Sequence, residues 1–189
     1  TSLVESMLYL TGATDRLGRI ADGNTVCDFD PEETRRQISI SAALAPVEHN
    51  GCKINVLDTP GYFDFAGEVM ESLQAADAAV IVTTSKSGAL SVGAGKAWKY
   101  CEKRRLPRMI YISKTDEDNA DYNAAFETLR AEFGKNVAPL IAPIWDESKK
   151  VVGLIDVLHK RAYSFDRVPA RRWMYPRTSS PCWTSCTTP

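Results

Sequence analysis

A short acidic motif follows a segment that reads as a β-strand. Asp58-Thr59-Pro60-Gly61 comes directly after the apolar run INVL. In open α/β sheets, ligands bind beyond the carboxyl ends of the strands, where an Asp can hold a magnesium ion, often through water. The glycine lets the backbone approach a phosphate, because it has no Cβ. Taken alone, the motif is short, and an ordinary turn after a strand would also explain it.

A second motif with recognisable chemistry ends another strand pattern. Ser113-Lys114-Thr115-Asp116 closes the run MIYI, about 55 residues after the first motif. The carboxylate of Asp116 can accept two hydrogen bonds from the N1–H and N2–H₂ edge of guanine, and the stem of Lys114 can lie across the ring plane. A solvated turn is the alternative for this motif as well. Two such turns at the same end of one sheet favour a nucleotide site.

Thr1 is the third candidate, because it stands immediately before an apolar-periodic segment. Phosphate-binding loops of the form GxxxxGK[ST] end in a Ser or Thr that opens a helix and binds magnesium. The alternative is a threonine that only caps a helix. The glycines and the strand of such a loop do not stand in the sequence as given, which begins without Met.

The elements that would position these motifs alternate between strand and helix periodicity. Residues 12–37 are polar and without a sustained period, which predicts a long loop. Asn50-Gly51 is a strong hairpin signal. Strands are expected over 38–44, 52–58, 78–83, 109–113 and 137–141, and helices over 1–10, 64–75, 92–105, 119–133 and 153–161.

This order predicts an α/β fold with a mostly parallel sheet, helices on both of its faces and one antiparallel hairpin at an edge. Apolar residues make up 44% and charged residues 25% of the 189 residues, as in ordinary globular proteins. The net charge of −1 provides no general basic surface for nucleic acid. The five cysteines form no CxxC pair, which favours reduced thiols over a zinc site or a disulfide framework.

From Thr1 to about Asp166 the chain resembles the G domain of elongation factor G. The segments that carry the resemblance are TSLVESMLYLTG, RRQISISAALA, INVLDTPGYFDF, GEVMESLQAADAAVIV, LPRMIYISKTD and GLIDVLHKRAYSF. The resemblance implies a P-loop NTPase-like G domain that binds GTP and Mg²⁺ and hydrolyses GTP in step with ribosomal translocation. It further implies a cytoplasmic, monomeric protein that binds the ribosome and no membrane. The first strand and the phosphate loop are expected to be lacking, so we expect the fragment to be inactive by itself.

The resemblance also assigns roles to single positions. Thr1, Ser39 and Asp58 correspond to the metal-binding residues of the phosphate loop, switch I and switch II. The residues expected to bind the nucleotide are Thr1, the segment from Asp58 to Gly61, and the segment from Ser113 to Asp116. Tyr62 takes the catalytic position that orients the attacking water.

Three positions depart from the family pattern. The family carries His where this chain has Tyr62, and a phenol is a poor general base at neutral pH. It carries Asn in place of Ser113, and it reads RGIT where this chain reads Arg36-Gln37-Ile38-Ser39. These departures predict a divergent paralogue. A ribosomal-protection GTPase of the tetracycline-resistance type and a binding remnant that does not hydrolyse GTP are the alternatives.

Three segments of different character divide the chain. Residues 1–150 are expected to form the partial G domain, and residues 151–166 the start of an inserted subdomain. Residues 167–189 hold four Arg, four Pro and no acidic residue, without helical or strand periodicity. We interpret them as an aberrant, frameshifted and disordered tail. A natural disordered extension is the alternative.

Overall fold

The computed structural model describes residues 1–86, 90–117, 119–148 and 150–165. The interpretation of residues 167–189 therefore falls outside the described part of the chain. The fold divides into two compact units, Thr1–Ile81 with Ser91–Ile110, and Val82–Leu90 with Tyr111–Pro189. Strands β3 (Ala79–Thr84) and β4 (Arg108–Ser113) contribute residues to both. The predicted domain boundaries at 150 and 166 remain predictions.

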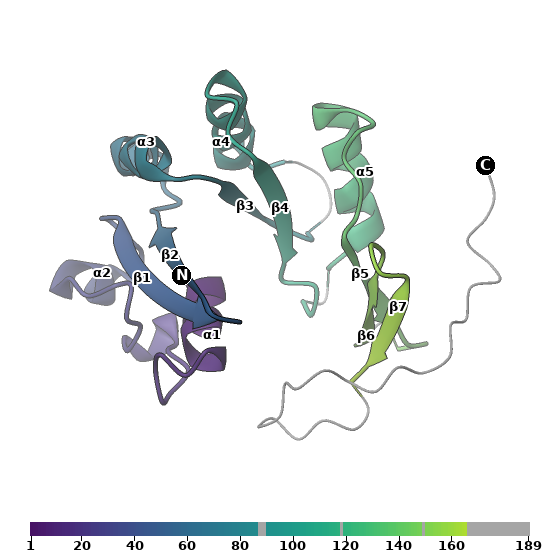
Figure 1. The fold of residues 1–189 in the computed structure, drawn as a ribbon, viewed down its shortest axis with the longest axis horizontal. Helices are drawn as coiled ribbons and strands as arrows, with labels where there is room; N and C mark the ends of the chain where they lie inside the picture. The colour runs from purple at the N-terminus through teal and green to yellow at the C-terminus, as the bar shows by residue number, and fades with distance from the viewer. Residues whose placement is uncertain (87–89, 118, 149, 166–189) are drawn as a thin grey trace. The chain divides into compact units, whose positions relative to one another are not determined.

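The first unit begins with helix α1, Ser2–Leu10, as the sequence predicted (Figure 1). Val4 and Leu8 lie four residues apart on one face of the helix and are buried. They pack in a hydrophobic core with Cys27 and with the inward residues of the first strand. This core joins α1 to the hairpin that ends in the acidic motif.

The predicted hairpin is present as strands β1, Ala43–His49, and β2, Cys52–Asp58. The strands are antiparallel, and His49 lies opposite Cys52 across a two-residue turn. Asn50 and Gly51 have φ angles of 50° and 75°, the left-handed conformation that a type I′ turn requires. The hairpin carries Asp58 at its very end.

The predicted start of the first strand was wrong. Residues 38–42 precede β1, and Leu44, within β1, is 62% exposed. Ala43, Ala45 and Val47 are buried instead, as small residues against α1. The backbone before Ala43 is held by acidic side chains and not by a partner strand, which explains the later start.

The segment expected to be one long loop contains a short helix. Besides a 3₁₀ turn, η1, over Ile20–Asp22, helix α2 spans Pro31–Arg36. Asp30 and Glu33 form a capping box at its start, and Pro31 occupies the first turn, where its missing N–H costs nothing. Local capping therefore creates a helix where the apolar periodicity gave no signal.

The remaining elements of the first unit agree closely with the predicted ranges. They are η2 (Phe63–Phe65), α3 (Ala66–Ala75) and α4 (Val92–Lys103). Strands β3 (Ala79–Thr84) and β4 (Arg108–Ser113) form one sheet. The amide of Ala79 donates to Pro107 and that of Ser85 donates to Ser113, both at 2.9 Å, so the two strands advance in the same direction.

The second unit holds helix α5, Tyr122–Phe133, and three strands after it. Asp121 caps α5 by accepting from the amide of Ala124 at 2.9 Å. The strands β5 (Ile141–Trp145), β6 (Val151–Asp156) and β7 (Arg161–Ser164) form an antiparallel sheet in that order.

Two predictions in this unit were wrong. The strand expected over 137–141 starts at Ile141, and the helix expected over 153–161 is a strand, a turn and a second strand. β6 pairs with neighbours on both sides, so tertiary hydrogen bonding overrides its helix-like spacing. At Gly153 an added Cβ would stand 2.2 Å from the carbonyl oxygen of Tyr163, which shows how closely the two strands approach.

The α/β fold class is thus confirmed. The described strands form three small sheets, β1-β2, β3-β4 and β5-β6-β7. No helix in the described ranges combines the length and the apolar character needed to cross a membrane.

Candidate functional site

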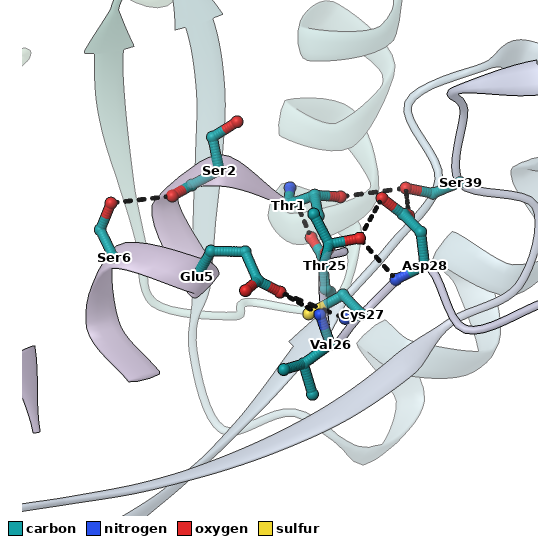
Figure 2. Close-up of polar contacts among 10 residues, drawn as sticks. Thr1, Ser2, Glu5, Ser6, Thr25, Val26, Cys27, Asp28 and Ser39 are labelled. Carbon is teal, nitrogen blue, oxygen red and sulfur yellow. Dashed lines mark hydrogen bonds and ion pairs between the residues drawn. The ribbon is translucent and has the colours of Figure 1, made fainter. Parts of the chain in front are cut away.

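The three positions assigned to metal binding lie together in the first unit. The hydroxyl oxygens of Thr1 and Ser39 are 3.0 Å apart, and the amino group of Thr1 lies 3.1 Å from Oδ1 of Asp58. The side chains of Thr1 and Asp58 are 5% and 11% exposed. Figure 2 shows the hydroxyl of Thr1 directed at Ser39. Three segments that are far apart in the sequence therefore place oxygen atoms around one point.

Thr1 occupies the cap position of α1, but its side chain makes no capping hydrogen bond. Its hydroxyl is turned toward Ser39 instead. The simple helix-cap interpretation of Thr1 therefore does not describe the side chain.

Asp28 belongs to the same cluster, although no motif in the sequence pointed to it. Its carboxylate accepts from the hydroxyl of Ser39 at 2.6 Å and from that of Thr25 at 3.0 Å, and the residue is 6% exposed (Figure 2). A buried carboxylate requires such partners. The capping pair Asp30-Pro31, two residues later, marks an ordered segment, but it does not single out Asp28.

Glu5 fixes this ordered segment to α1. It is 1% exposed, and its Oε1 accepts from the amides of Val26 at 2.7 Å and Cys27 at 3.2 Å (Figure 2). Its Oε2 faces Gly18, where an added Cβ would come within 2.2 Å of that oxygen. The helix that opens with Thr1 thus also holds the backbone next to Asp28.

Glu33 and Glu68 hold the chain on the other side of Ser39. Glu33 accepts from the amides of Ile40 and Ser41 at 2.8 and 3.0 Å, and Glu68 accepts from that of Ala42 at 2.7 Å. Burial works to raise the pKa of Glu33, but the backbone N–H groups that donate to it outweigh burial and lower the pKa. Glu33 is therefore a charged anchor that fixes the position of Ser39.

The cluster has the chemistry of a hard-cation site. Oδ2 of Asp58 is buried without a hydrogen-bond partner among the described residues, whereas Oδ1 of the same carboxylate faces the nitrogen of Thr1. Mg²⁺ prefers oxygen ligands of this kind and keeps several waters. Burial raises the pKa of the Cys27 thiol to about 12, and the carboxylates of Asp58 and Glu5 contribute to the rise.

The rest of the first motif forms an open turn. Pro60 is buried, and a Cβ added to Gly61 would meet no atom within 4 Å, which leaves its backbone accessible. Tyr62 follows with 58% of its surface exposed. The next residue, Phe63, lies under the ammonium of Lys96, 3.4 Å from the ring centroid, so α4 holds the end of this turn.

The second motif lies at the end of β4. Ser113 donates its hydroxyl to the carbonyl of Thr83 at 3.1 Å, and Lys114 adopts a left-handed conformation with φ of 59°. Thr115 is partly buried and Asp116 is exposed. An open depression of about 350 Å³ lies here, lined by Lys86, Asp116, Glu117 and Asn119. The carboxylate of Asp116 is therefore accessible to a ligand.

Comparison with known proteins decides the family. The chain matches the elongation factor Tu GTP binding domain over residues 1–172. It belongs to this family. The resemblance to the G domain of elongation factor G, which the sequence predicted, is confirmed.

Several relatives match most of the chain. Mitochondrial ribosome-releasing factor 2 of Anopheles gambiae is 40% identical over 158 residues, which cover 84% of this chain and 21% of the relative. An elongation factor G-like protein of Mycobacterium tuberculosis is 36% identical over 165 residues, or 87% and 22% of the two chains. Elongation factor G of Chlamydia caviae is 34% identical over 174 residues, or 92% and 25%.

A crystal structure of a protein from Thermus thermophilus has the same fold. The TM-score is 0.82 at 39% sequence identity, and the match covers 88% of this chain and 25% of the other. The chain thus spans about a fifth to a quarter of the length of the proteins it matches.

Proposed function

We propose that this chain is the guanine-nucleotide-binding part of an elongation factor G-like translational GTPase. The observation that carries the proposal is the convergence of Thr1, Ser39 and Asp58. Ser39 and Asp58 lie 38 and 57 positions after Thr1 in the sequence, and both are within hydrogen-bond distance of Thr1. A purely structural role for these residues gives no reason for two hydroxyls and a carboxylate to gather at one point.

In this proposal the cluster holds Mg²⁺ together with the phosphates of GTP. The hydroxyls of Thr1 and Ser39 and the carboxylate of Asp58 would hold the ion, directly or through water. When bound, the ion would offset the negative charge of the phosphates. Asp28 accepts a hydrogen bond from the hydroxyl of Ser39 and so orients it, which leaves an oxygen lone pair for the ion. The backbone of Thr59, Pro60 and Gly61 lines the phosphates.

The base is read in the second unit by the segment from Ser113 to Asp116. Asp116 accepts from N1–H and N2–H₂ of guanine, and the methylene groups of Lys114 cover the ring. The exposure of Asp116 beside an open depression supports this assignment. Adenine has neither donor at the matching positions, so it is rejected.

Tyr62 takes the position that orients the attacking water during hydrolysis. Its exposure gives its hydroxyl access to solvent. A phenol can hold a water by a hydrogen bond but does not accept its proton at neutral pH. We therefore propose slow GTP hydrolysis, coupled to translocation on the ribosome, in a cytoplasmic protein that acts as a monomer.

A second function within the same class follows from the relatives. One of them bears the name ribosome-releasing factor 2 and another is called elongation factor G-like. Together with the departures at Tyr62 and Ser113, these names support a divergent paralogue, and release from the ribosome is the second candidate for its step. Ribosomal protection has no comparable observation in its favour.

Titration with a fluorescent GDP analogue tests the proposal. Unlabelled GDP and GTP should displace the analogue and ATP should not, and removal of Mg²⁺ should weaken GTP binding at least tenfold. Asp58→Ala should abolish the effect of Mg²⁺, whereas Asp64→Ala, a carboxylate removed from the exposed η2 turn nearby, should preserve it. Equal displacement by ATP and GTP would contradict a guanine site.

A further inference from the structure

One buried serine connects the strand β3 to the segment that carries Asp116. Ser85 follows β3 directly and is 0% exposed. Its amide donates to the carbonyl of Ser113 at 2.9 Å, and its hydroxyl donates to the carbonyl of Lys114 at 2.6 Å. Its own carbonyl accepts from the amide of Asp121 at 2.8 Å. All three polar groups of Ser85 thus engage the segment between residues 113 and 121.

The hydroxyl of Ser85 reaches the most strained point of that segment. Lys114 has φ of 59°, a conformation that a residue with a Cβ adopts rarely. Such a backbone persists only where its surroundings hold it. The bond from Ser85 to the Lys114 carbonyl fixes the peptide plane that leads into Thr115 and Asp116. The path of the chain after β4, and with it the position of Asp116, therefore depends on Ser85.

Ser113 cannot supply this support. Its hydroxyl donates to the carbonyl of Thr83, which lies back along the neighbouring strand β3 and not in the segment that follows β4. An Asn at position 113, as in the family pattern, would extend an amide further from the backbone. In this chain the hydroxyl of Ser85, which follows β3, makes the contact with the segment after β4 that the shorter side chain of Ser113 does not make.

The segment after β3 makes a second connection through charge. Lys86 and Lys114 both bind the carboxylate of Glu117, at 2.6 and 3.1 Å. The lysine side chains are more than half exposed, so each pair contributes little to stability. The shared carboxylate nevertheless restricts where the Lys114 ammonium can lie, beside the depression that Asp116 lines.

We infer that Ser85 is a positioning residue for guanine recognition, which holds Lys114 and Asp116 in the orientation that binds the base. The inference rests on the proposed function and adds a residue to it. Ser85 itself touches no base, because its side chain is enclosed. It acts through the backbone of Lys114.

Ser85→Ala tests the inference with two readouts in the intact protein. The first is hydrogen exchange of the amides of Lys114–Glu117, which should become at least tenfold faster, whereas the amide of Asp121 keeps its bond to the carbonyl of residue 85. The second is the preference for GDP over IDP, whose base lacks the 2-amino group from which Asp116 accepts. This preference should fall about threefold to tenfold, as expected for one misaligned hydrogen bond. In Asp116→Ala, adding Ser85→Ala should change the preference no further.

Thr128→Ala is the matched control, because it removes a hydroxyl-to-carbonyl bond of 2.8 Å from α5 in the same unit. It should leave both readouts unchanged. Exchange within α5 separates local loosening from global unfolding in every variant. Wild-type exchange at Lys114–Glu117 in Ser85→Ala would overturn the inference. A wild-type protein without any guanine preference would contradict the proposed function, and the exchange rates would then decide the role of Ser85 by themselves.

Discussion

Thr1 and Ser39 share a hydroxyl–hydroxyl contact of 3.0 Å across 38 positions of sequence. Asp28 lies behind Ser39 and Asp58 lies beside Thr1. The contact exists because α1 holds one hydroxyl while two acidic side chains, Glu33 and Glu68, hold the backbone that follows the other. Substitution of either Thr1 or Ser39 can therefore test whether the cluster binds an ion.

Replacement of Ser39 tests whether its hydroxyl serves the ion. In Ser39→Ala the Mg²⁺ concentration needed for half-maximal GTP binding should rise about tenfold, because one oxygen ligand is lost. Ser39→Thr keeps the hydroxyl and should stay near the wild type. Titration of Mg²⁺ against a fluorescent GTP analogue measures both. Equal Mg²⁺ requirements in the two variants would exclude Ser39 from the ion site.

Asp116→Asn should change which base is bound. An amide can donate to the O2 of xanthine, which replaces the 2-amino group of guanine, so preference should move from GDP toward XDP. Competition between the two nucleotides measures the change. Asp121→Asn is the control, because it makes the same chemical change at the cap of α5, where Asn serves as well as Asp. A shift of preference in that control as well would mean that Asp116 does not read the base.

Gln37→Gly should stabilise the protein. Gln37 ends α2 with φ of 56°, a left-handed position that glycine occupies without strain. The gain should be about 0.5–1 kcal/mol, after allowance for the greater freedom of glycine in the unfolded chain. Chemical denaturation measures it. Gln37→Ala retains the strained Cβ, so a gain of the same size there would show that the conformation is not the cause.

Glu33→Gln should reduce stability and its dependence on pH. The pKa of Glu33 is lowered in the folded state from its ordinary value of 4.5, so its stabilising effect is complete above that value and is lost as the pH falls below it. At pH 7 the variant should lose about 1–3 kcal/mol, typical of hydrogen bonds to a buried charge. Between pH 7 and about pH 3 its free energy of unfolding should fall less than that of the wild type.

The control for this comparison is Glu71→Gln, at an exposed position of α3. It should follow the wild-type curve. Parallel pH curves for Glu33→Gln and the wild type would show that Glu33 is not a charged anchor in the folded protein.

Local chemistry explains which elements the sequence predicted well. Asn50-Gly51 specifies a type I′ turn, so the hairpin and its second strand over 52–58 were predicted, whereas the first strand was predicted to start too early. The helix wrongly predicted over 153–161 has apolar spacing that fits either a helix or a strand. Its strand pairing depends on β5 and β7, which lie outside any short window of sequence.

Only those residues of the candidate site that match motifs of the elongation factor G family were predicted from the sequence. Thr1, Ser39 and Asp58 occupy positions of the family's motifs. Asp28 and Ser85, in contrast, lie in segments that have neither a motif nor a regular apolar period. Their importance comes from long-range hydrogen bonds, to Ser39 and to Lys114. Such bonds connect residues 11 and 29 positions apart, and no local pattern reports them.

The burial of two thiols has a practical consequence for labelling experiments. Among the described cysteines, Cys27 and Cys101 are buried and Cys52 is exposed. Burial raises the pKa of both enclosed thiols, and at Cys101 the nearby Arg108 offsets only part of that effect. Of these three, Cys52 alone offers an accessible thiol to a maleimide dye under native conditions. A fluorophore there would sit beside the Asn50-Gly51 turn, at the opposite end of β2 from Asp58, and would report hairpin opening without touching the ion site.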